Sequence, residues 1–267
     1  MDERPIGMFD SGVGGLTVFS EVIKDNPYED IIYLGDTKRF PYGTKSKETI
    51  IDLSKKSIEF LLRKNVKAII IACGTATSQA LKTVEKIYKI PIIGIISPTV
   101  DSLAKEKNIN KIGIIATVGT IKSGAWEKEI KEKIKNVEVI NKGCSLLAPM
   151  AEEGWTDNEI AKLTIKEYLK DMKDIDKLIL GCTHYPLFMD IIKKEYNENI
   201  EIIDTGKKIG NYLKEFLQKN QLQNSKIHKP NYEFCLTDTE NKFIEVAYKL
   251  IKDKSIINNN TLKKVQI

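Results

Sequence analysis

The segment Val66-Lys67-Ala68-Ile69-Ile70-Ile71-Ala72-Cys73-Gly74-Thr75 joins an aliphatic run to a cysteine and a threonine. A second segment, Lys177-Leu178-Ile179-Leu180-Gly181-Cys182-Thr183-His184, repeats this pattern in the other half of the chain. Each run is short and unbroken, which is typical of a parallel strand buried on both faces, and a stretch of helical length follows it. Ligands of open α/β sheets bind beyond the carboxyl ends of the strands, so we expect both cysteines at a functional site.

The same alternation of strand-like and helix-like segments runs along the chain. Short aliphatic runs predict strands at residues 6–9, 31–34, 66–72, 92–96, 112–116, 137–140, 178–181 and 200–203. Between them lie segments with helical spacing, such as the one that carries Ile50, Leu53, Ile58 and Leu61. This pattern indicates the α/β class, with parallel sheets covered by helices on both faces.

The two halves of the chain resemble each other. Landmarks recur at nearly one offset: Gly7 and Gly113 differ by 106, Pro41 and Pro149 by 108, and Cys73 and Cys182 by 109. We therefore expect a duplicated unit, in which two similar lobes face each other across a pseudo-two-fold axis. The active site would lie in the cleft between the lobes, with one cysteine on each side.

The pattern changes after residue 206, which sets the predicted domain boundaries. A helix at 207–220, a strand at 232–236 and a helix near 241–251 make a piece too small for a third lobe. We expect residues 1–97 with 207–267 to form the first lobe and residues 98–206 the second. The tail at 258–264 is expected to be frayed.

Composition limits the class of protein. The chain has 267 residues, of which 42% are hydrophobic and 30% charged, as in soluble globular proteins. No apolar run approaches the roughly 18 residues that span a membrane. The N-terminus leads straight into a predicted strand without a signal region, so we expect a cytoplasmic protein. The net charge of +5 comes from scattered lysines, which predicts no nucleic-acid surface.

Two thiols on opposite sides of one substrate can invert a carbon centre without a cofactor. One thiolate removes the Cα proton from one face while the other thiol returns a proton to the opposite face. Cysteine is suited to this work because neighbouring groups can tune its free pKa of about 8.5. We therefore predict a two-base racemase that uses Cys73 and Cys182.

Polar residues near the strand ends could assist the thiols. Asp10 and Ser11 end the first predicted strand, where a carboxylate can orient or deprotonate a thiol. His184 follows Cys182 by two residues, and Glu152 could serve similarly. Hydroxyls and strand-end amides, which can anchor a substrate carboxylate, come from Thr75, Thr117 and Thr183.

Other signals have simpler interpretations. Cys144 and Cys235 fit small buried hydrophobes, and four cysteines are too few for a disulfide scaffold. Cys182 and His184 supply two metal ligands without a second pair, so no metal site is predicted. The run Gly12-Val13-Gly14-Gly15 lacks the spacing of a nucleotide-binding loop and predicts a tight turn against the substrate or the other lobe.

Four ordered motifs resemble the bacterial glutamate racemases, within the aspartate/glutamate racemase family. They are Phe9-Asp10-Ser11-Gly12-Val13-Gly14-Gly15-Leu16-Thr17-Val18, Leu34-Gly35-Asp36-Thr37-Lys38-Arg39-Phe40-Pro41-Tyr42-Gly43, Ala72-Cys73-Gly74-Thr75-Ala76 and Gly181-Cys182-Thr183-His184-Tyr185-Pro186-Leu187. The resemblance implies cofactor-independent racemisation of L-glutamate to D-glutamate for peptidoglycan synthesis in the cell wall, by a homodimer.

The resemblance also implies roles for residues. Cys73 would handle the proton of the D-enantiomer with help from Asp10, and Cys182 that of the L-enantiomer with help from His184 and Glu152. The implied substrate contacts are Asp10, Ser11, Tyr42, Gly43, Gly74, Thr75, Thr117, Thr183 and His184.

One departure from the family pattern concerns Gly74, where the family usually has asparagine. The side chain that would contact the substrate is absent, which puts substrate affinity in question more than the type of reaction. A racemase of aspartate or another small substrate stays open, as do a hydrolase that uses Cys182 with His184 and a non-catalytic binding role.

Overall fold

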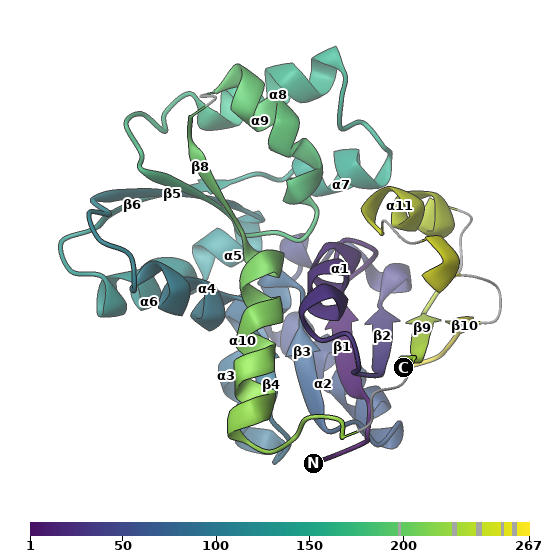
Figure 1. Ribbon diagram of the computed structural model, residues 1–267. Coiled ribbons are helices and arrows are strands. Elements are labelled where there is room, and N and C mark those ends of the chain that lie inside the picture. Colours follow the sequence, from purple (N-terminus) through teal and green to yellow (C-terminus); the bar gives the residue numbers. More distant parts are fainter. Residues whose placement is uncertain (197–198, 226–228, 239–241, 252–253, 258–260) are drawn as a thin grey trace.

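The structure is a computed structural model that describes residues 1–267 except 197–198, 226–228, 239–241, 252–253 and 258–260 (Figure 1). Within these residues the strands form two sheets, and every strand pairing is parallel. The first sheet has the order β10-β9-β2-β1-β3-β4, with β1 (Ile6–Asp10), β2 (Ile31–Gly35), β3 (Ala68–Ile71), β4 (Ile92–Gly94), β9 (Tyr232–Leu236) and β10 (Leu262–Lys264). The second has the order β6-β5-β7-β8, with β5 (Lys111–Ala116), β6 (Glu138–Gly143), β7 (Lys177–Leu180) and β8 (Glu201–Asp204).

The two sheets repeat one strand order, which confirms the prediction of two similar α/β lobes. The order β2-β1-β3-β4 in the first sheet matches β6-β5-β7-β8 in the second. Ile6 pairs with Ala68 and Ile112 pairs with Lys177, so each cysteine stands five residues beyond an equivalent pairing. Cys73 and Cys182 therefore occupy matching places at the carboxyl ends of β3 and β7.

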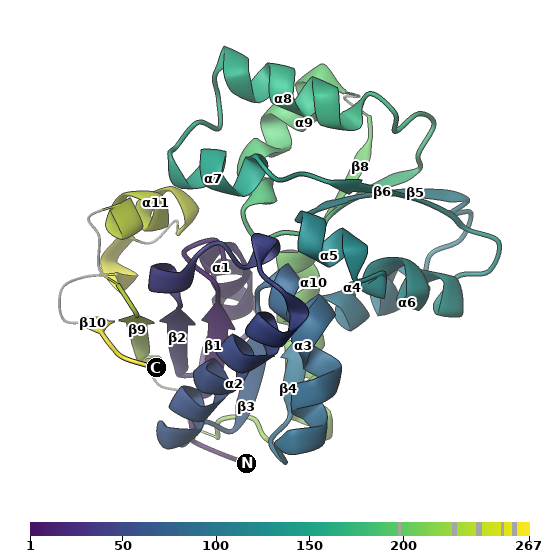
Figure 2. The same ribbon diagram turned by 180° about the vertical axis from the view of Figure 1, so that it is seen from behind.

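Helices cover both faces of the first sheet because its strands are aliphatic on both sides. One face carries α1 (Leu16–Asp25) and α10 (Thr205–Lys219), and the other carries α2 (Lys47–Arg63) and α3 (Gly74–Ile87), as Figures 1 and 2 show from opposite sides. Met8 and Ile70 belong to the hydrophobic cluster of the first face, while Phe9 and Ile71 belong to that of the second. This alternation along each strand buries both sets of side chains.

The second sheet is covered in the same way (Figure 2). The helices α4 (Ile96–Leu103), α5 (Val118–Lys122) and α6 (Ala125–Lys133) lie on the side toward the first lobe, and α7 (Leu147–Glu152), α8 (Glu159–Leu169) and α9 (Met189–Glu195) lie on the far side. Ile112 and Ile114 join the cluster that contains Met8 and Ile70, so one core continues from lobe to lobe.

Two local predictions were wrong. The strand expected at 92–96 ends at Gly94, because Ile95 already has helical backbone angles and accepts a hydrogen bond from Thr99 in the first turn of α4. The tail at 258–264 is not frayed throughout: residues 262–264 form β10, which pairs with β9 at the edge of the first sheet. Residues 258–260 lie outside the described residues.

The segment after residue 206 packs against elements of the first sheet. The helix α10 lies along α1, where the Asn26 side chain donates to the carbonyl oxygen of Gly210 at 3.0 Å. The strand β9 pairs with β2, and α11 (Lys242–Leu250) follows it. The helix expected near 241–251 is thus confirmed for its described part; residue 241 lies outside the described residues.

Candidate active site

The carboxyl ends of β1 and β3 face the carboxyl ends of β5 and β7, and hydrogen bonds join them directly. The Thr183 hydroxyl donates to Asp10 Oδ2 at 3.3 Å, and the Thr17 hydroxyl donates to the Thr183 carbonyl at 3.0 Å. The hydroxyls of Thr75 and Thr117 lie 2.9 Å apart. Three contacts between residues distant in sequence thus bring the predicted site residues into one place.

Cys73 is the residue before the first turn of α3, and its sulfur takes part in capping that helix. The Sγ atom accepts a hydrogen bond from the Ala76 amide at 3.5 Å and lies 3.6 Å from the Ser11 hydroxyl. Burial raises the pKa of the thiol to about 12, with the nearby Asp10 carboxylate adding to the rise against the two hydrogen bonds. Without a ligand, Cys73 is therefore a protonated thiol at neutral pH.

Asp10 ends β1 and is fully buried. Its Oδ1 atom accepts from the Gly12 amide at 2.9 Å, which fixes the turn that follows the strand. Burial raises the pKa of this carboxyl, although the positive charge on His184 and the amides of Gly12 and Gly15 act in the other direction. The carboxyl is thus held by the Gly12 amide of its own lobe through Oδ1 and by the Thr183 hydroxyl of the other lobe through Oδ2.

The glycine turn predicted after β1 packs against the second lobe. A Cβ atom at Gly14 would lie 2.5 Å from the imidazole of His184 and 2.6 Å from the Thr183 hydroxyl. A Cβ atom at Gly15 would lie 2.5 Å from Asp10. Glycine at both positions therefore lets the loop contact His184 and Asp10. Of the two predicted neighbours of this turn, the substrate and the other lobe, the contact with His184 is one with the other lobe.

The second thiol belongs to a chain of three groups. Cys182 Sγ lies 3.9 Å from His184 Nδ1, and His184 Nε2 lies 2.7 Å from Glu152 Oε1 at the end of α7. Burial acts to lower the pKa of His184, but the contacts with Cys182 and Glu152 outweigh it and raise the pKa to about 10. A pKa raised this far keeps His184 positively charged at neutral pH, beside the Cys182 sulfur.

Tyr42 and Gly43 reach the site from a loop after β2. The loop contains two short 3₁₀ turns, η1 (Thr37–Arg39) and η2 (Tyr42–Thr44). A Cβ atom at Gly43 would lie 2.7 Å from Thr117 Cβ, so this glycine allows contact with the second lobe. Tyr42 is buried beside Cys73 in one hydrophobic cluster, and its hydroxyl donates to Asp36 Oδ2 at 2.6 Å.

Gly74 contacts the backbone of the opposite lobe. A Cβ atom here would lie far inside van der Waals contact with the carbonyl oxygen of Gly181. Because Gly74 follows Cys73 and Gly181 precedes Cys182, this contact brings the two thiol-bearing strand ends together. Any side chain at position 74 would have to separate them.

Sequence reasoning assigned no role to three residues that build the site. Asp36 is fully buried and holds Tyr42, while Thr237 donates to Asp36 Oδ1 at 2.8 Å. The Phe40 ring lies 5.4 Å from the His184 ring, between centroids. Asp36 and Thr237 directly follow β2 and β9, so the rule that pointed to the cysteines, polar residues at the carboxyl ends of parallel strands, could have found both.

The described residues contain no group of three or more His, Cys, Asp or Glu side chains placed to hold a metal ion. The same part of the chain has no helix that is long and apolar enough to cross a membrane. What the site offers is two buried thiols, a buried carboxyl, a histidine paired with a glutamate, and several hydroxyls. This set can remove a proton from one side of a bound molecule and add one on the other.

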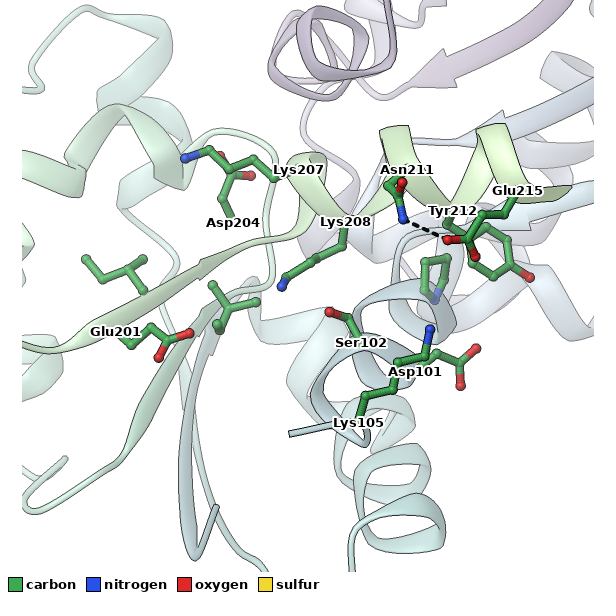
Figure 3. A pocket seen from close by; sticks show the side chains of 13 residues that line it. Asp101, Ser102, Lys105, Glu201, Asp204, Lys207, Lys208, Asn211, Tyr212 and Glu215 are labelled. Atoms are coloured by element: carbon green, nitrogen blue, oxygen red, sulfur yellow. Dashed lines mark hydrogen bonds between the residues drawn. The ribbon is translucent and has the colours of Figure 1, made fainter. Parts of the chain in front are cut away.

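A separate cavity of about 400 Å³ lies between α4, β8 and α10 (Figure 3). Charged side chains of both signs line it, among them Asp101, Lys105, Glu201 and Lys208. Its lining includes neither Cys73 nor Cys182, so the cavity is distinct from the site at the strand ends.

A model of the Asp/Glu/hydantoin racemase family matches residues 19–209. The chain belongs to this family. A glutamate racemase of Geobacter metallireducens is 40% identical over 256 residues, which cover 95% of each chain. One from Sulfurihydrogenibium is 50% identical over 213 residues, which cover 79% of this chain and 82% of the other. The fold matches the crystal structure of Francisella tularensis glutamate racemase in complex with D-glutamate, with a TM-score of 0.91, 39% identity and coverage of 100% and 98%.

Membership of the racemase family and the structural match confirm the family and fold that the sequence motifs predicted. An aspartate racemase of Picrophilus torridus has a TM-score of 0.58 at 17% identity and shares the fold.

Proposed function

We propose that the chain is a cofactor-independent glutamate racemase. The observation that carries the proposal is the pair of thiols at equivalent strand ends, Cys73 after β3 and Cys182 after β7, which the Gly74–Gly181 contact brings together. The similarity to glutamate racemases over most of the chain supports glutamate as the substrate. The product, D-glutamate, would serve peptidoglycan synthesis in the cytoplasm.

In this mechanism the substrate lies between the two sulfurs. With L-glutamate bound, Cys182 as a thiolate removes the Cα proton while the Cys73 thiol delivers a proton to the opposite face, and the product is D-glutamate. The imidazolium of His184, held by Glu152, stabilises the Cys182 thiolate. The reverse reaction exchanges the roles, with Asp10 beside Cys73.

The substrate's own charges complete the site. The α-ammonium group, placed near Cys73, would lower the pKa of this thiol and offset the burial that raises it. We assign the carboxylates of the substrate to the backbone amides and hydroxyls at the strand ends, in particular Ser11, Gly74, Thr75, Thr117 and Thr183. Asp10, Tyr42, Gly43 and His184 complete the contacts.

We also propose that residues 1–97 with 207–267 move as one lobe and residues 98–206 as the other, and that the enzyme works as a homodimer. Hydrogen bonds such as that from Thr183 to Asp10 join the lobes beside the thiols, and in this proposal the lobes separate there to admit the substrate.

The first experiment is to incubate the purified protein with L-glutamate in the presence of EDTA, with no cofactor added, and to follow the loss of optical rotation. L-aspartate is tested in parallel. Inversion of glutamate alone supports the proposal. Inversion of aspartate alone keeps the two-thiol mechanism and changes the substrate. Release of ammonia or another hydrolysis product without inversion would indicate the Cys182–His184 hydrolase instead.

A further inference from the structure

The loop that carries Tyr42 and Gly43 is attached to the C-terminal segment of the chain. Thr237, which follows β9, is almost fully buried. Its hydroxyl donates to Asp36 Oδ1 at 2.8 Å and accepts from the Lys38 amide at 3.0 Å. One hydroxyl therefore bonds both the carboxylate before η1 and the backbone within η1.

Further hydrogen bonds between neighbouring residues strengthen the attachment of this loop to the segment after β9. The Thr37 hydroxyl donates to the carbonyl oxygen of Asp238 at 2.6 Å and accepts from the Asp238 amide at 2.8 Å. The Thr237 amide also donates to the Gly35 carbonyl at 3.1 Å, which extends the pairing of β9 with β2. The loop is thus fixed at its start by a segment about 200 residues away.

Asp36 connects Thr237 to Tyr42 through hydrogen bonds to its carboxylate. Its Oδ1 atom accepts from Thr237 and from Arg39 Nε at 3.0 Å, and its Oδ2 atom accepts from the Tyr42 hydroxyl at 2.6 Å. The carboxylate is fully buried, so an oxygen that loses its donor cannot bond to water instead unless the surrounding residues rearrange. The loop itself consists of single 3₁₀ turns, which have little stability of their own.

We propose that Thr237 is a positioning residue for substrate binding. Its hydroxyl holds Asp36, Asp36 holds Tyr42, and the loop then places Gly43 against Thr117 and Phe40 beside His184. The strand β9 lies outside the duplicated four-strand unit, so this added segment gives the first lobe a support for the substrate loop that the second lobe lacks among the described residues. The inference rests on the proposed racemase function.

The test compares Thr237→Val, which keeps the size of the side chain, with Thr237→Ser, which keeps the hydroxyl. Loss of a hydrogen bond to a buried carboxylate predicts a rise in KM for L-glutamate of roughly tenfold in the valine variant. The kcat value should change by less than about twofold, because Thr237 contacts none of the groups that move protons. The serine variant should restore KM.

Ser57→Ala is the matched control, because it removes a buried hydroxyl that donates to the carbonyl of Leu53 within α2. Its KM should equal that of the unaltered protein. A second readout needs no substrate: trypsin should cut after Lys38 and Arg39 faster in Thr237→Val than in Thr237→Ser or Ser57→Ala. Should the valine variant fail to fold, Asp36→Asn, which weakens the same contacts, should show the same KM and cleavage effects.

The outcomes separate this inference from the proposed function. An unaltered protein that racemises glutamate, together with a folded Thr237→Val variant whose KM and cleavage rate are unchanged, would overturn the positioning role. An unaltered protein that inverts no amino acid would overturn the proposed function, and the cleavage rates would still decide whether Thr237 holds the loop.

Discussion

Gly74 and Gly181 come from different lobes, and their backbones touch at the point where the two thiol-bearing strands end. The contact depends on the absence of a side chain at position 74. Since cores and interfaces are close-packed, a side chain placed here cannot be absorbed without moving one of the two backbones. The close approach of the strand ends that carry Cys73 and Cys182 therefore depends on glycine at position 74.

This relationship predicts graded damage from larger residues at position 74. Gly74→Ala should lower kcat/KM by roughly tenfold and Gly74→Asn by more, because each widens the gap between the sulfurs by a different amount; overpacking of this kind costs about 1–3 kcal/mol. Kinetics of both variants in both directions give the measurement. Full activity of Gly74→Asn, which carries the asparagine that the family resemblance leads one to expect, would mean that the contact is not kept during turnover.

Both thiols are predicted to be essential. Cys73→Ser and Cys182→Ser should each reduce racemisation by about 10²–10⁴-fold, since a serine hydroxyl is a far weaker acid than a thiol. Cys235→Ser is the control, because Cys235 is buried at β9 and its sulfur bonds Glu233, which a hydroxyl can also do. Substantial activity in either of the first two variants would rule out the two-thiol mechanism.

Solvent isotope should enter the product and not the recovered substrate. In D₂O, the thiol opposite the one that removes the proton delivers deuterium to Cα, so early samples should carry label mainly in the product enantiomer. Mass spectrometry after chiral separation gives both fractions. Equal early labelling of substrate and product would instead indicate a single base that exchanges with solvent.

The raised pKa of His184 predicts a loss of stability at high pH. The folded value of about 10 lies above the ordinary 6.5, so the stabilisation is fully present below pH 6.5 and is lost as the pH rises toward 10. Glu152→Gln should remove part of it, about 1.5–3 kcal/mol at pH 6.5 and progressively less toward pH 10. Urea unfolding at several pH values measures this, with the exposed neighbour Glu153→Gln as control. A Glu152→Gln deficit that stays constant with pH would contradict the assignment.

A buried ion pair at the other end of the sheet predicts a change in stability without a change in catalysis. Lys67 Nζ lies 2.5 Å from Glu29 Oε2 and 2.7 Å from the Asp2 carbonyl, and the Lys67 side chain is fully buried. Lys67→Met removes the cation from the buried Glu29 carboxylate, which would still accept from the Asn224 amide, and should lower the free energy of unfolding by about 3–5 kcal/mol.

The catalytic constants of Lys67→Met should be unchanged where the protein is folded, because position 67 precedes β3 whereas Cys73 follows it. The exposed Lys128→Met serves as control and should change neither quantity. A large fall in kcat for Lys67→Met under folding conditions would mean that the two ends of β3 are coupled.

The sequence determined the elements and the chemistry of this protein. The aliphatic runs before Cys73 and Cys182 are local signals, because a short strand that is buried on both faces must consist almost entirely of apolar residues. The rule that ligands bind at strand ends then points to Asp10, both cysteines and His184 from their positions in the chain. The equal offsets of the landmarks likewise predicted two similar lobes, which the repeated strand order confirms.

Only the tertiary structure decided which distant segments meet. Thr237 bonds Asp36 across 201 residues, and residues 262–264 add a strand to β9 instead of fraying. Neither follows from periodicity, because edge pairing of a short polar segment depends on the strand already present beside it. The contact between Gly74 and Gly181 is of the same kind, because it results from the packing of the two lobes. The residues around Gly74 in the sequence do not determine how closely the Gly181 backbone approaches in the folded chain.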